Sequence, residues 1–130
     1  PQEMIDRLAA AAAEGKEKGI KGLPGQLGIE MAAEMIAKIK DEKLCDGVHI
    51  MAIGAEKNVP VILEKAGIDL ALCAHHHKWR VIPSGEHGKN YPLLVNSADE
   101  RMDVVITSQS IDVKTYATDG TLVHQWNNNK

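Results

Sequence analysis

The spacing of apolar residues changes along this chain, and that change most limits the folds it can adopt. In the first half, apolar residues recur mainly at helical spacing, which predicts helices over residues 2–14, 27–43 and 58–66. Residues 14–28, rich in Gly and Lys, predict a loop. Beyond residue 80 the apolar residues alternate with polar ones or form short runs, as in strands. The first half therefore predicts α/β structure, and the second half predicts antiparallel β structure.

A βαβ unit should lie in the middle of the chain. GVHIMAIG, residues 47–54, is too short for a helix and rich in β-branched residues, so it predicts a buried strand. A short helix should follow, with Asn58 as its N-cap and Gly67 at its C-terminal stop. IDLALCA, residues 68–74, predicts the second strand. Parallel strands place their carboxyl ends at one sheet edge, where open α/β sheets bind ligands.

The C-terminal half predicts antiparallel hairpins. The candidate strands are LLVNSA, MDVVITSQ, SIDVKTYA and TLVHQW. ATDGT, between the last two, contains Asp-Gly, a strong hairpin signal, and the final NNNK is expected to fray. We predict a mixed α/β (α+β) fold, with N-terminal helices, the βαβ unit and the hairpins in one small sheet. The 130 residues fit a single domain.

The composition argues against several classes of partner. The net charge is −3 with both signs interspersed, which differs from the basic surface of a nucleic-acid binder. No apolar run reaches the length that spans a bilayer, and the N-terminus lacks a signal-peptide pattern. Cys45 and Cys73 lie in apolar contexts and are expected to be buried free thiols in a reducing compartment. We therefore expect a cytoplasmic protein with no nucleic-acid or membrane partner.

A family resemblance in residues 1–68 rests on four stretches: PQEMIDRL, GIEMAAEMIAKIK, CDGVHIMAIG and VPVILEKAGI. In order and spacing they resemble the C-terminal part of the methylenetetrahydrofolate reductase family. The resemblance implies the end of a (β/α)₈ barrel and a flavin-dependent reduction of a folate-bound one-carbon unit. Such pockets are built from strand ends around the whole ring, so a terminal segment cannot rebuild them. No flavin is therefore expected here.

A second resemblance in residues 69–130 rests on LCAHHHKW, YPLLVNSADERMDVVITSQ and VKTYATDGTLVHQW. These stretches resemble the C-terminal end of calcineurin-like metallophosphoesterases, which carry Gly-His-x-His after a buried strand. Ala74 stands at the Gly position. The resemblance implies that His75 and His77 are metal ligands, that His76 is the variable residue, and that the metal is zinc, manganese or iron.

The other metal ligands of that family come from upstream motifs, and the first half of this chain contains none of these motifs. Two-metal hydrolysis needs roughly six to eight protein ligands, including a bridging carboxylate, so two histidines supply only part of such a centre. Glu86, His87 and Asp99 lie in the following loops and are candidates for one more ligand. His124, which alternates with Leu122 and Trp126, is expected to be a packing residue.

Three hypotheses about function stay open. The first is a metallophosphoesterase-like fragment, a metal-dependent hydrolase in origin, which retains a partial histidine site and has little or no activity alone. The second is a non-catalytic chimera, a recombined or engineered fold with inert histidines or a weak binding module. The third is a fragment of a flavin-dependent reductase. An incomplete barrel leaves an open sheet edge, so a homo-oligomer formed through that edge is also expected.

Overall fold

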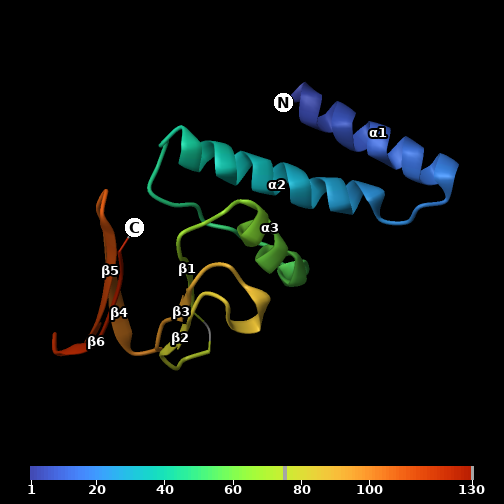
Figure 1. Ribbon diagram of the computed structural model, residues 1–130. Coiled ribbons are helices and arrows are strands. Elements are labelled where there is room, and N and C mark those ends of the chain that lie inside the picture. The colour runs from blue at the N-terminus through green and yellow to red at the C-terminus, as the bar shows by residue number, and fades with distance from the viewer. Residues whose placement is uncertain (75, 130) are drawn as a thin grey trace. The chain divides into compact units, whose positions relative to one another are not determined.

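The N-terminal part of the protein is helical. The computed structural model describes residues 1–74 and 76–129, and its helices are α1 (Gln2–Lys18), α2 (Leu23–Asp41) and α3 (Val59–Lys65) (Figure 1). The turn between α1 and α2 is shorter than the predicted loop over residues 14–28. Only Gly19 and Gly22, with φ of 68° and 80°, need the left-handed backbone that ends one helix and precedes the next.

Two helices of this part enclose a small apolar core. Ala33 and Ile36 of α2 are buried against Ile62 of α3 and the adjoining Ala66. The predicted limits of α3 are confirmed, because Asn58 immediately precedes it and Gly67 takes a φ of 62° just beyond its end. The Asn58 side chain makes no capping hydrogen bond.

Residues 47–54 form no strand, so the predicted βαβ unit is wrong. Among the described residues up to 68, no strand is present to pair with them. An apolar run without a neighbouring strand cannot satisfy its backbone groups in a ladder. Ile50 instead packs against the α2–α3 core, whereas Met51 and Ile53 are 79% and 93% exposed. The apolar residues of this run that the prediction buried in a sheet therefore lie largely on the surface.

The first sheet contains β1 (Ala71–Cys73), β2 (Arg80–Ile82) and β3 (Leu93–Val95) in the order β1-β3-β2. β1 is parallel to β3, and β2 is antiparallel to β3. A short 3₁₀ helix, η2 (Glu86–Gly88), lies on the connection from β2 to β3. The strand β2 was not predicted from the sequence.

The second sheet is an antiparallel meander of β4 (Glu100–Ile106), β5 (Ser110–Ala117) and β6 (Leu122–Asn129) (Figure 1). The predicted Asp-Gly hairpin joins β5 to β6, with Gly120 at a φ of 86°. The predicted fraying is wrong for Asn127 to Asn129, which continue β6, and Lys130 lies outside the described residues. The side-chain amide of Asn127 donates a 2.7 Å hydrogen bond to Asp112 on β5.

The two sheets share one apolar core, although a single sheet was predicted. Leu94 of β3 is buried with Ile111 and Val113 of β5. The surrounding residues are Leu70, Trp79, Met102, Val104 and Trp126. The mixed α+β class, with helices first and an antiparallel sheet last, is confirmed.

The chain divides into two compact units, residues 1–68 and 69–130. The first unit holds the helices and the second holds both sheets. In the described part of the chain, no helix is both long and apolar enough to cross a membrane.

Candidate functional site

The parallel pair β1 and β3 brings two chain segments to one edge of the first sheet. Ala71 pairs with Leu93, Cys73 pairs with Val95, and the Asn96 N–H extends the ladder by donating to the Cys73 carbonyl at 2.9 Å. The chain therefore leaves the sheet at the same edge after Cys73 and after Asn96. The predicted partner of β1 was residues 47–53; the true partner is β3, which still delivers two carboxyl strand ends to one edge.

Residues from these two segments line a pocket of about 310 Å³. Its lining residues are Ala74, His77, Asn96, Ser97, Ala98 and Glu100. His77, one of the two metal ligands that the resemblance implies, is exposed at this pocket and has a φ of 56°, which is uncommon for a residue other than Gly. His75, the other implied ligand, lies outside the described residues.

Asn96 closes the turn that leads from β3 into β4. Its side-chain Nδ2 donates a 3.0 Å hydrogen bond to the carbonyl oxygen of Glu100. Because of this bond, the Nδ2 end of the amide faces the turn. The other end, Oδ1, is buried and accepts no hydrogen bond from any described residue.

Glu100 is the first residue of β4, and its side chain is only 13% exposed. Its Oε1 lies 3.6 Å from Nε2 of His124, which stacks on Trp79 with ring centroids 4.7 Å apart. Its Oε2 is buried and has no hydrogen-bond partner within residues 1–74 and 76–129. The predicted packing role of His124 is confirmed, because its ring covers the indole beside the core.

Thr115 of β5 adds a third buried oxygen to this end of the core. In the strand register Thr115 is opposite both Met102 of β4 and His124 of β6. Its side chain is fully buried, and its Oγ1 has no hydrogen-bond partner in the described part of the chain. The inward face of the second sheet thus changes from apolar to polar at Glu100, Thr115 and His124.

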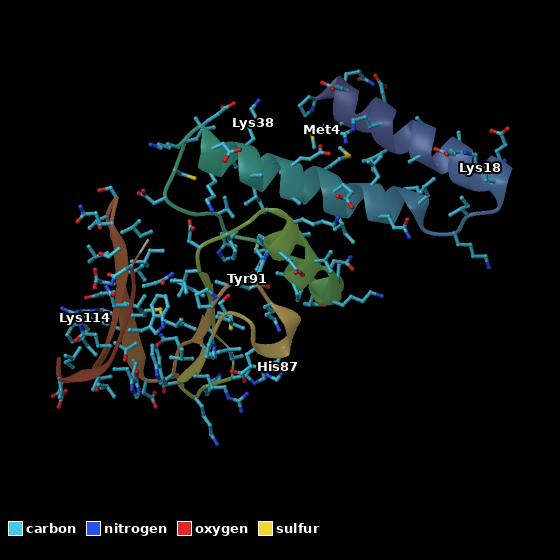
Figure 2. The ribbon with its side chains drawn as sticks, in the orientation of Figure 1. Met4, Lys18, Lys38, His87, Tyr91 and Lys114 are labelled. Carbon is cyan, nitrogen blue, oxygen red and sulfur yellow. The ribbon has the colours of Figure 1, made fainter. Side chains whose placement is uncertain are left out.

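The loop residues proposed as additional ligands do not line the pocket. His87 lies exposed on η2 (Figure 2). Its Nε2 is 3.4 Å from Oε1 of Glu86, which is also exposed. Asp99 is exposed, and its neighbour Glu100 lines the pocket in its place.

Sequence reasoning missed Asn96 and Glu100, although a signal for Glu100 was present. Glu100, Met102 and Val104 alternate at the spacing of one strand face, and β4 begins two residues before the predicted strand. Extending the alternation backwards would have placed this carboxylate beside the core.

The cysteines add no ligand to the site. Within the described ranges Cys45 and Cys73 are free, as predicted, but both are exposed rather than buried. Desolvation raises the pKa of the Cys73 thiol, which disfavours the thiolate that a metal would bind. Residues 1–74 and 76–129 contain no group of three His, Cys, Asp or Glu side chains placed to hold a metal ion. In the described part of the pocket lining, the residues whose side chains carry oxygen or ring nitrogen are His77, Asn96, Ser97 and Glu100.

Comparison of the chain with protein-family models, with curated proteins and with solved structures gives no match.

Proposed function

We propose that residues 69–130 form a divalent-cation-binding module. In this proposal the module is a metallophosphoesterase-like fragment that retains part of a metal site and has little or no phosphoesterase activity alone. The observation that carries it is the pocket at the shared edge of β1 and β3, where His77 lies with Asn96 and Glu100.

The donors in the pocket suit one divalent cation. Imidazole nitrogen binds Zn²⁺ and related metals, and carboxylate and amide oxygens bind harder ions such as Mn²⁺. In the described part of the pocket lining, no Lys or Arg is present to repel a cation. A bound cation supplies Lewis-acid polarisation of a phosphoryl oxygen. His77, Asn96 and Glu100 would hold it.

A two-metal hydrolytic centre does not fit these donors. Two ions about 3.5–4 Å apart need a clamp on both the attacking and the leaving oxygen, and a carboxylate between them. The described lining offers one carboxylate, Glu100, and that side chain also faces His124. Phosphoester turnover would therefore need donors from a second chain. The strands β2 and β6 end their sheets and offer edges through which a homo-oligomer could supply them.

The proposal gives residues 1–68 no catalytic role. Among the described residues there, no strand is present whose end could begin a flavin pocket. We also place the protein in the cytoplasm, because free cysteines suit a reducing compartment.

Two measurements on the full chain test the proposal. Calorimetric titration with Mn²⁺ or Zn²⁺ should show one cation per chain, and binding should weaken in His77→Ala but not in His87→Ala, an exposed histidine away from the pocket. Hydrolysis of an aryl phosphate should stay near the buffer rate with either metal. Absence of binding at millimolar cation would overturn the module. Rapid metal-dependent hydrolysis that His77→Ala abolishes would show a complete active site instead of a fragment.

A further inference from the structure

We infer that the outer edge of β6 binds β6 of a second copy of this chain, in antiparallel pairing about a two-fold axis. The inference goes beyond the proposed function, because it rests on the strand edges alone and holds whether or not a cation binds. The second sheet has the order β4-β5-β6, and no described strand pairs with the outer edge of β6. An unpaired edge presents backbone N–H and C=O groups with which another strand can form a ladder.

The other strand edges of the two sheets carry features that oppose such pairing. β1 and β2 are each three residues long, and short edge strands offer few groups to pair with. The first residues of β4 include Glu100, Arg101 and Asp103. Charged side chains on an edge, and a charge that points inward as Glu100 does, both disfavour an added strand. These three edges are therefore poor docking surfaces.

β6 has none of these protective features. It is eight residues long, and its sequence LVHQWNNN contains no Pro, Lys, Arg, Asp or Glu. A register shift beside Leu122 affects only the start of the strand, and residues 124–129 pair regularly with β5. Leu122 and Val123 are 48% and 43% exposed. A long, regular and uncharged edge strand is the kind of edge on which strand pairing between chains occurs.

The residues of β6 make a second copy of the same strand a suitable partner. Like charges directly opposite each other destabilise a strand pair, and two copies of β6 bring no formal charges together. Gln125, Asn127 and Asn129 are exposed along the strand. Their amides carry both donors and acceptors, so the same side chains can pair with each other across the contact. A two-fold contact of this kind uses the same surface on both copies and closes after two chains.

The alternation of side chains limits the register of this contact. Opposite residues of two paired strands point to the same face of the sheet, so an outward residue of β6 must be opposite an outward residue of the second copy. The longest overlaps that satisfy this condition place the two-fold axis at Gln125 or at Trp126. In both registers the two copies of residue 125 lie opposite or diagonal to each other, on the exposed face.

The test is sedimentation equilibrium of the full chain in excess chelator, so that no cation contributes. The mass should rise with concentration from one chain to two and stop there, because one strand pair is a small contact that closes on itself. Gln125→Glu should raise the dimer dissociation constant roughly three- to tenfold, since it brings two carboxylates together across the contact. Within one chain the new carboxylate would be opposite Lys114 on β5, which favours the native fold.

Gln109→Glu is the matched control, because it makes the same change at an exposed residue between β4 and β5, away from the edge of β6. Its dissociation constant should stay within about twofold of the wild-type value. Amide hydrogen exchange of the wild type adds a measurement that needs no variant. Protection should increase with chain concentration in β6 and not in β4.

Three outcomes would overturn the inference. One is a mass of a single chain at all concentrations up to about 1 mM, which corresponds to a binding free energy weaker than about −4 kcal/mol. Another is a dimer that Gln125→Glu leaves unchanged and that protects amides outside β6, because its interface lies elsewhere. The third is growth beyond two chains, which a closed two-fold contact does not allow. All three leave the cation site untouched, since the calorimetric titration tests it separately.

Discussion

Replacing Thr115 by Val should stabilise the second unit, although most substitutions in a core destabilise. The Thr115 side chain is fully buried, and its hydroxyl makes no hydrogen bond to any described residue. Val has the same branched shape and the same preference for a strand, so β5 should keep its backbone and its register. The substitution therefore removes an unsatisfied oxygen and adds a methyl group to the core.

The expected gain follows from the cost of that oxygen. A buried polar group without a partner costs about 1–3 kcal/mol, and we expect Thr115→Val to recover about 1–2 kcal/mol of it. For a small unit with a urea m-value of about 1–2 kcal/mol per M, the unfolding midpoint should rise by about 1 M.

Tryptophan fluorescence during urea unfolding measures this change in the relevant unit. The chain contains two tryptophans, and Trp79 and Trp126 both pack against the core of residues 69–130. An unchanged m-value with a higher midpoint would show that the folded state gained stability without a change in compactness.

The same substitution at Thr107 should destabilise the unit instead of stabilising it. The Thr107 hydroxyl accepts hydrogen bonds from the backbone N–H groups of Gln109 and Ser110, at 3.1 and 2.9 Å. Thr107→Val should therefore lower the free energy of unfolding by about 0.5–1.5 kcal/mol, and the urea midpoint with it. A lower midpoint in Thr115→Val as well would mean that the buried hydroxyl has a partner such as ordered water. Ordered water would then also be expected as the partner of the buried oxygens of Asn96 and Glu100.

Three further predictions concern other parts of the protein. Gly15→Ala should destabilise α1, because its Cβ would lie 2.9 Å from a backbone carbonyl oxygen, whereas Gly28→Ala, with open space around its Cβ, should stabilise α2 by about 0.5–1 kcal/mol. Circular dichroism during thermal unfolding measures the stability of both variants, and a stability change in the same direction in both would contradict the prediction. Leu94→Ala should cost about 2–5 kcal/mol in the tryptophan-detected urea transition, because Leu94 is fully buried between the sheets. Hydrogen bonds from Asn127 and Ser110 lower the pKa of Asp112, so its stabilising contribution is present at neutral pH and is lost as the pH falls below about 4, through the folded-state pKa. Asn127→Ala should raise that pKa in a carboxyl NMR titration, and an unchanged titration would refute the cause.

Local signals in the sequence predicted that the three helices exist. They predicted the limits of α3 but not the end of α1 or the start of α2. The limits of α3 were predictable from its flanking residues, because Gly67 takes the left-handed backbone just beyond the helix end, although Asn58 makes no side-chain capping hydrogen bond. The glycines of residues 14–28 misled the prediction of a loop, since Gly15 lies within α1 and Gly28 within α2. A glycine inside a helix has only a modest cost in stability. An isolated glycine is therefore weak evidence for a loop.

Non-local pairing could not be predicted from local pattern. Residues 47–54 have the composition of a buried strand, but a strand also needs a partner, and the described residues of their unit offer none. The true partner of β1 is β3, which follows after β2 and η2. That pairing decides the candidate site, because it brings Asn96 and Glu100 to the edge where His77 lies.

The most direct test of the cation-binding module is the urea midpoint of wild-type tryptophan fluorescence, measured in Mn²⁺ and in excess chelator. A ligand that binds only the folded state stabilises it by about 2.7 kcal/mol at a concentration one hundred times its dissociation constant. We predict a midpoint that rises with Mn²⁺ concentration in the wild type and in Asp103→Asn, a control whose side chain pairs with Arg101 and does not line the pocket. The midpoint should rise less in Glu100→Gln. The same wild-type midpoint with Mn²⁺ and with chelator would contradict the account.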